Sequence, residues 1–217
     1  PIAGELYFMY ATMLIAVPTG VKVFNWVTTM YKGALTFETP MLFSIAFVIL
    51  FTFGGFTGMM LSIAAADTQY HDTYFVVAHF HYVMVAGAVF SGTAAVYYWL
   101  PKWCGKMYDE TMGKLQFWIA FIAFNITFMP QHFLGLAGMP RRYSDYGLQF
   151  ADWNMVSSIG AFLYGGAQLL FLFNVIRTIG WGKPIDDPKV WEGAEGLEWT
   201  LPTPAPFHTF STPPIVK

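Results

Sequence analysis

Residues 71–83 read HDTYFVVAHFHYV, and a charge-free run extends from Thr73 to Pro101. An uncharged segment of this length can cross a bilayer as a helix. His79 and His81 fall inside it, and an ionisable side chain within a membrane span is costly and usually functional. At 3.6 residues per turn, the two imidazoles leave the helix about 200° apart. They cannot share one metal ion, whereas each could give a nitrogen to a separate haem; the alternative is two core histidines paired to neighbouring helices.

The composition is that of an integral membrane protein. Of the 217 residues, 56% are hydrophobic, 19% aromatic and only 11% charged, unlike a soluble domain. The net charge of −2 gives no sign of a nucleic-acid interface. Cys104 is the single cysteine, which excludes an internal disulfide and a CxxC metal site, so histidines and carboxylates remain as candidate metal ligands.

Five apolar segments are long enough to span a membrane as helices, which predicts an all-α integral membrane bundle. The predicted spans are residues 6–31, 39–66, 73–101, 115–135 and 155–176. We expect residues 1–180 to form the transmembrane segment and residues 181–217 an extramembrane tail. Gly54 and Gly58 have the small-xxx-small spacing that permits close helix packing. Most basic residues fall at one end of the bundle, so the positive-inside rule predicts that this end and the tail face the cytoplasm or matrix.

The two loops at the opposite, outer end carry charges suited to anions and metal ions. Asp67, His71 and Asp72 precede the histidine helix, and Arg141 and Arg142 lie in the loop GMPRRYSDY. Because both loops belong to one side, we expect them to converge. Paired arginines suit planar carboxylates, and a carboxylate oxygen suits Mg²⁺, although imidazole is an unusual partner for that ion. The alternative is that these charges form solvated surface turns.

Lys22 is the other conspicuous charge, because it lies within the first predicted span. Thr19 precedes it by three residues in PTGVK, so the two side chains share one helix face. A buried lysine loses its charge readily and can pass a proton. The alternative is a lysine whose side chain extends to the nearby inner headgroups.

Together these motifs resemble the last five of the twelve helices in the large subunit of haem-copper oxidases. HFH resembles the tenth helix of that subunit, and Tyr82 after it is similar to the cytochrome c oxidases rather than the quinol oxidases. The resemblance implies the following roles in this numbering: His79 for the high-spin haem a3, His81 for the low-spin haem a, Arg141, Arg142 and Asp67 for the haem propionates, His71 and Asp72 for magnesium, and Thr19 with Lys22 for a lysine-dependent proton pathway.

The function implied by the resemblance is reduction of O₂ to water with electrons from cytochrome c, coupled to proton translocation. Copper B would be ligated by residues outside this chain. The implied partners are the N-terminal part of subunit I, on a separate chain or in a removed segment, together with subunit II with its dinuclear copper centre, subunit III, cytochrome c and membrane lipid. The expected location is the mitochondrial inner membrane, with the bacterial plasma membrane as the alternative. A quinol oxidase of the same superfamily, and a non-catalytic scaffold or transporter half, are the alternative functions.

Overall fold

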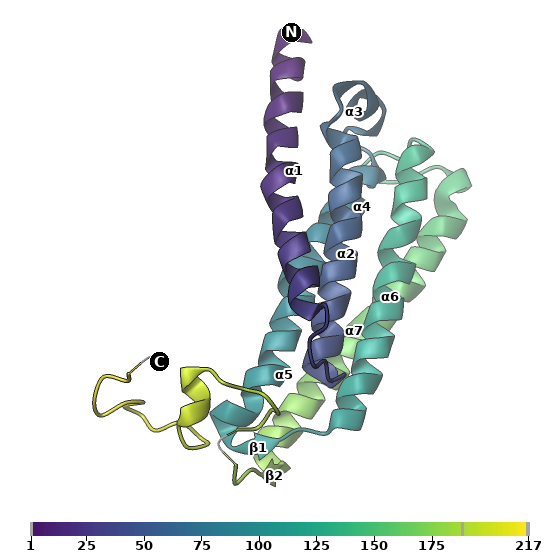
Figure 1. Ribbon diagram of the computed structural model, residues 1–217. Coiled ribbons are helices and arrows are strands. Elements are labelled where there is room, and N and C mark those ends of the chain that lie inside the picture. The colour runs from purple at the N-terminus through teal and green to yellow at the C-terminus, as the bar shows by residue number, and fades with distance from the viewer. Residues whose placement is uncertain (1, 188, 216–217) are drawn as a thin grey trace.

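The protein is a bundle of long apolar helices that run side by side (Figure 1). The computed structural model describes residues 2–187 and 189–215. Within these residues, five helical segments are long and apolar enough to cross a membrane. The predicted all-α bundle of five membrane-length helices is therefore confirmed.

The element bounds follow the predicted spans with small shifts. The long segments are α1 (Ile2–Met30), α2 (Thr39–Ser62), the histidine helix Tyr74–Cys104, α6 (Glu110–Leu136) and α7 (Ala151–Trp181). The histidine helix consists of α4 (Tyr74–Met84), a π-helical turn η1 (Val85–Phe90) and α5 (Ser91–Cys104). Shorter elements connect or follow them: α3 (Ala64–Tyr70), η2 (Leu148–Phe150), η3 (Leu197–Thr200) and the paired strands β1 (Lys106–Met107) and β2 (Lys183–Pro184).

Capping residues explain where the helices begin. The Asp109 carboxylate accepts a hydrogen bond from the backbone N–H of Met112 at 3.0 Å, so α6 begins at Glu110 and not at 115 as the sequence predicts. This hydrogen bond and the nearby Arg177 guanidinium lower the pKa of Asp109. Thr73 caps α4 in the same way, through its hydroxyl and the N–H of Phe75.

Aromatic side chains fill the centre of the bundle. Phe43 of α2 packs against Phe90 and Tyr97 of the histidine helix and against Phe117 of α6, with ring centroids 5.0–6.1 Å apart. In contrast, none of the residues of α1, all of which the structure describes, is buried. It contacts α2 through Trp26, whose ring is 4.8 Å from that of Phe47. The first helix is therefore the element with most surface left to cover.

The two ends of the bundle are built differently. The helix α3 and the N-terminus lie at one end, while β1, β2 and the C-terminal tail lie at the other (Figure 1). At the tail end, the buried ammonium of Lys102 donates to the carbonyl of Leu201 at 2.6 Å and to the Thr203 hydroxyl at 3.0 Å. Trp199 is almost fully buried beneath this ammonium. The tail therefore packs onto the bundle end that carries most of the lysines.

Candidate functional site

His79 projects from α4 toward α2. Its Nδ1 lies 2.9 Å from the carbonyl oxygen of Gly54 and 3.2 Å from the hydroxyl of Thr57. A carbonyl oxygen only accepts, so Nδ1 carries the proton and Nε2 keeps its lone pair. A carbonyl behind the ring also fixes the orientation of a ligating histidine. The half-buried ring is thereby prepared to bind a metal through Nε2.

The glycines of α2 give the His79 ring its space. A Cβ added at Gly58 would lie 2.6 Å from Cε1 of His79, and one at Gly54 would lie 2.9 Å from Cβ of Tyr82. Both distances are too short for a side chain at either position. The close packing predicted from the Gly54 and Gly58 spacing is confirmed, and it is directed at the histidine helix.

A cavity of about 420 Å³ lies between α1 and α2 and has His79 in its wall. Its other lining residues are mostly apolar and include Phe24 and Phe56, with Thr19 of α1 among the few polar ones. Cofactor sites in proteins are typically of this size and character, with a small number of placed polar groups. The His79 face therefore opens onto space for an apolar group.

His81 projects toward a different helix. Its Nδ1 lies 2.7 Å from the carbonyl oxygen of Val77. Its ring stacks on Phe128 of α6, with centroids 4.2 Å apart and planes at 16°. As at His79, Nδ1 is the protonated nitrogen and Nε2 is available. The expectation that the two imidazoles leave opposite faces agrees with these contacts, since one ring meets α2 and the other meets α6.

The donor chemistry fits two haems bound on separate faces of one helix. Each histidine has a backbone carbonyl on Nδ1 and a free Nε2, the nitrogen pattern of an axial haem ligand. The missing Cβ of Gly58 leaves the room that the His79 ring requires.

The two outer loops converge, as expected. Tyr74 donates its N–H to the carbonyl of Met139 at 2.9 Å, and Arg141 donates its N–H to the carbonyl of Asp72 at 2.8 Å. The hydroxyls of Tyr74 and Tyr143 lie 3.0 Å apart. Backbone and side-chain contacts therefore hold the arginine loop against the start of the histidine helix.

Within these loops the predicted site residues differ in their surroundings. Nε of Arg141 is 3.6 Å from the Asp72 carboxylate, while Arg142 is exposed. Asp72 and Arg142 have φ angles of 55° and 59°, a left-handed conformation that is uncommon outside glycine and often marks functional sites. The half-exposed carboxylate of Asp67 lies 3.8 Å from Nδ1 of His71.

His71 and Asp72, the two residues predicted to bind magnesium, lie next to each other. Nε2 of His71 lies 3.4 Å from a carboxylate oxygen of Asp72. No group of three or more histidine, cysteine or acidic side chains arranged for a metal occurs among residues 2–187 and 189–215. Two ligands from this chain would therefore need others from water or from a second polypeptide.

The two residues of the predicted proton pathway lie one turn apart on α1 and differ in their surroundings. Thr19 lines the cavity beside His79, and its hydroxyl donates to the carbonyl of Ile15 at 2.8 Å. Lys22 is exposed on the surface of α1. The reason is that α1 packs mainly against α2 in this chain, so most of its surface is uncovered.

One contact beside the histidines has no signal in the sequence. The hydroxyl of Tyr82 donates to the side-chain oxygen of Asn125 at 2.8 Å, and both lie within the membrane-length helices. Tyr82 also packs against the rings of Phe53, Phe124 and His132. An asparagine in an apolar run suggests a buried hydrogen bond, but only the packed helices identify its partner.

Comparisons with known proteins agree with the fold and the motifs. Residues 1–163 match the family described as cytochrome c and quinol oxidase polypeptide I. Over 214 residues the chain is 54% identical to a cytochrome c oxidase subunit 1 from Cereibacter sphaeroides, covering 98% of this chain and 38% of the relative. Over 220 residues it is 49% identical to a protein of the same name from Bacillus sp. (strain PS3), covering 100% of this chain and 35% of the relative.

A solved structure has the same fold. A haem-copper terminal oxidase dimer determined by cryo-EM superposes with a TM-score of 0.73 at 17% identity, covering 82% of this chain and 37% of that chain. The chain thus spans 35–38% of the length of the two curated relatives. Both relatives are bacterial, so the comparisons support a multi-pass membrane protein and give no support to the expected mitochondrial location.

Proposed function

The chain belongs to the cytochrome c and quinol oxidase polypeptide I family, and we propose that it forms the carboxy-terminal portion of the catalytic subunit of a cytochrome c oxidase. In this proposal His79 binds the high-spin haem a3 and His81 the low-spin haem a. The observation that carries it is the pair of imidazoles with Nδ1 on a backbone carbonyl, one against α2 and one against α6.

The haems, when bound, supply electron transfer and oxygen binding. His79 would hold one iron, with its ring kept in place by the Gly54 carbonyl and Thr57. His81 would hold the other, with its ring fixed between Phe80 and Phe128. Because both ligands lie on one helix, their separation is set by the backbone and not by a flexible loop.

The outer loops would bind the polar edges of the cofactors. Arg141, Arg142 and Asp67 are proposed to contact the haem propionates, since guanidinium groups recognise carboxylates through paired hydrogen bonds. Arg141 already lies beside one carboxylate, that of Asp72. His71 and Asp72 would hold magnesium together with ligands from elsewhere.

The remainder of the enzyme would lie outside these 217 residues. We propose that the N-terminal part of subunit I, in the same polypeptide or another, supplies the copper B ligands and the second axial ligand of the low-spin haem. That part would also cover α1, none of whose residues is buried. Subunit II with its copper centre, subunit III and cytochrome c complete the proposed assembly.

The proposed location is the bacterial plasma membrane, given the bacterial relatives; the mitochondrial inner membrane is the less supported choice. The names of the two relatives also favour cytochrome c over quinol as the electron donor.

An absorption spectrum of the purified complex tests the proposal. Isolated through a tag on this chain, the complex should show two haem signals in the reduced-minus-oxidised spectrum, one of which shifts on addition of CO. Failure to find any haem in a complex that contains the whole of subunit I would contradict the assignment and favour a scaffold or transporter.

Replacing Lys22 with methionine tests the proton pathway. The variant should assemble with a normal haem spectrum but reduce its CO-reactive haem at least about tenfold more slowly, a loss within the range of proton-transfer catalysis. Stopped-flow reduction under anaerobic conditions measures this rate. Lys32→Met, an exposed lysine in the loop after α1, is the matched control and should leave the rate unchanged. Wild-type kinetics in Lys22→Met would remove Lys22 from the pathway.

A further inference from the structure

A hydrogen bond between α4 and α6 lies directly beside His81. The hydroxyl of Tyr82, a side chain that is only 1% exposed, donates to the side-chain oxygen of Asn125 at 2.8 Å. The amide nitrogen of Asn125 donates in turn to the carbonyl of Phe121, one turn earlier in α6, also at 2.8 Å. This second bond holds the amide group and leaves its oxygen to accept from Tyr82. In an apolar interior, no water replaces such a bond when one partner is removed.

A ring contact joins the same stretches of the two helices. The imidazole of His81 lies between Phe80 of its own helix, at 4.5 Å and 29°, and Phe128 of α6, at 4.2 Å and 16°. Phe128 follows Asn125 by three residues, so the two side chains share one face of α6. On α4, His81 and Tyr82 are adjacent in the sequence. The stack and the hydrogen bond are therefore neighbouring contacts across one interface.

The two contacts restrain different motions. Stacked rings attract one another with little dependence on direction, so a stack alone tolerates sliding and turning. A hydrogen bond weakens steeply when its angle changes, so the bond between Tyr82 and Asn125 fixes the rotation and height of α4 on α6. The stack on α6 then sets the plane of the His81 ring. The ring of His79 is held differently, by a carbonyl and a hydroxyl of α2.

We propose that Asn125 is a positioning residue for the low-spin haem. Through Tyr82 it sets the plane of the His81 imidazole, and the orientation and hydrogen bonding of an axial imidazole tune the electronic structure and the potential of a haem iron. Asn125 acts through these two side chains and needs no contact with the cofactor. The inference rests on the proposed function, in which His81 binds the low-spin haem.

Two single variants remove the bond from either side, in a complex that contains the whole of subunit I. Asn125→Leu removes the acceptor, and Tyr82→Phe removes the donor but keeps the ring. Each should shift the EPR g values and the midpoint potential of the low-spin haem, while the CO-reactive haem keeps its wild-type potential. The double variant should shift them no further than the larger single shift, because both changes remove one bond. Asn125→Asp, which keeps an acceptor oxygen, should restore most of the wild-type values.

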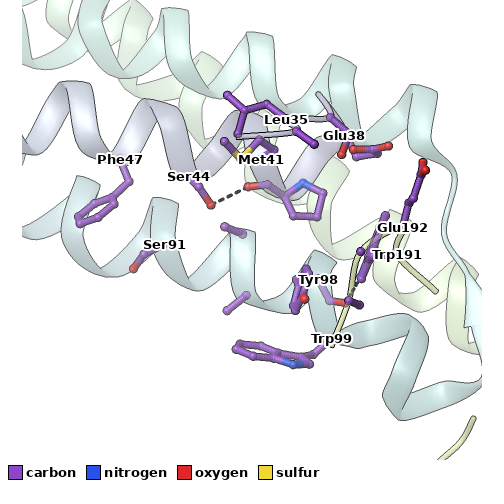
Figure 2. Close-up of a pocket in the computed structure, with 17 residues that line it drawn as sticks. Leu35, Glu38, Met41, Ser44, Phe47, Ser91, Tyr98, Trp99, Trp191 and Glu192 are labelled. Carbon is purple, nitrogen blue, oxygen red and sulfur yellow. Dashed lines mark hydrogen bonds between the residues drawn. The ribbon is translucent and has the colours of Figure 1, made fainter. Parts of the chain in front are cut away.

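Two controls make the same chemical changes elsewhere. Gln131→Leu removes a buried amide of α6 that donates to Ser157 of α7 at 3.0 Å, so it weakens the contact with α7. Ser91→Ala removes a hydroxyl from the histidine helix. Figure 2 shows Ser91 at the cavity of about 480 Å³ between α2, α5 and the tail, and its hydroxyl donates to the carbonyl of Gly87 in its own helix. Both controls should keep the wild-type g values and potential of the low-spin haem.

Unchanged g values and potential in both Asn125→Leu and Tyr82→Phe would overturn the proposal. An equal shift in Gln131→Leu would also overturn it, because the cause would then be a general loosening of the bundle. So would a shift confined to the CO-reactive haem, whose ligand Asn125 would then position. Wild type is measured first: absence of a low-spin haem there would contradict the proposed function together with this inference, whereas a normal wild type with unchanged variants contradicts this inference alone.

Discussion

Replacing His79 with alanine should abolish CO binding and oxygen reduction while leaving the low-spin haem signal. His79 faces α2 and the cavity between α1 and α2, whereas His81 faces Phe128 of α6. The two sites share a helix but no side chain, so removing one imidazole takes away one axial ligand only. No other histidine lines the cavity. The loss of turnover should therefore be complete.

The measurement is a reduced-minus-oxidised spectrum with and without CO, together with oxygen consumption. His208→Ala is the matched control, because His208 is exposed in the tail and its removal should change neither signal. If His79→Ala keeps CO binding and loses the low-spin signal, the assignments of the two haems are reversed. If both haem signals persist unchanged, His79 is not a haem ligand.

Replacing Gly135 with alanine should prevent stable assembly of the bundle. Gly135 lies near the outer end of α6, where a Cβ would overlap the backbone of Phe75 at the start of α4. Backbone atoms cannot rotate away as a side chain can, so α4 and α6 would have to separate. The free energy of unfolding should fall by about 3 kcal/mol or more, which is the upper end for an overpacked core. The displaced helix also carries His79 and His81.

Thermal unfolding of the purified complex, followed by haem absorbance, measures this effect. Gly165→Ala on α7 is the matched control, since a Cβ there meets nothing within 4 Å. This control should raise the free energy of unfolding by at most about 1 kcal/mol, because alanine has a higher helix propensity than glycine. Equal stability of the two variants would show that α4 and α6 do not pack as closely as described.

Much of the fold follows from the distribution of charge along the sequence. The charge-free run after Thr73 marks the histidine helix, and its 3.6-residue period separates the faces of His79 and His81. The loop before this helix and the arginine loop after α6 converge because the two crossings between them return the chain to one side. The spacing of Gly54 and Gly58 likewise indicates a close helix contact, although it does not identify His79 as the neighbour.

Contacts between distant segments are the part that the sequence does not indicate. Gly135 carries no local signal that distinguishes it from Gly165, because only the neighbouring helix decides whether a Cβ fits. The exposure of Lys22 depends on which chain covers α1, and the sequence near Lys22 does not contain that information. The predicted extramembrane tail gives no sign that Trp199 would be buried against Lys102.

The π-helical turn Val85–Phe90 divides the histidine helix into two segments with separate registers. A π turn accommodates one residue more than an α turn, and one residue corresponds to about 100° of rotation. Deleting a single residue here would allow a regular α-helix and keep the hydrophobic length. Such a deletion would also rotate one half of the helix relative to the other. Either Tyr97, which is buried against Phe43, would turn away from its partners, or His79 would turn away from its own. Insertions and deletions in this turn therefore change the rotation of the half that carries His79 and His81 relative to the inner half, although the span itself would remain intact.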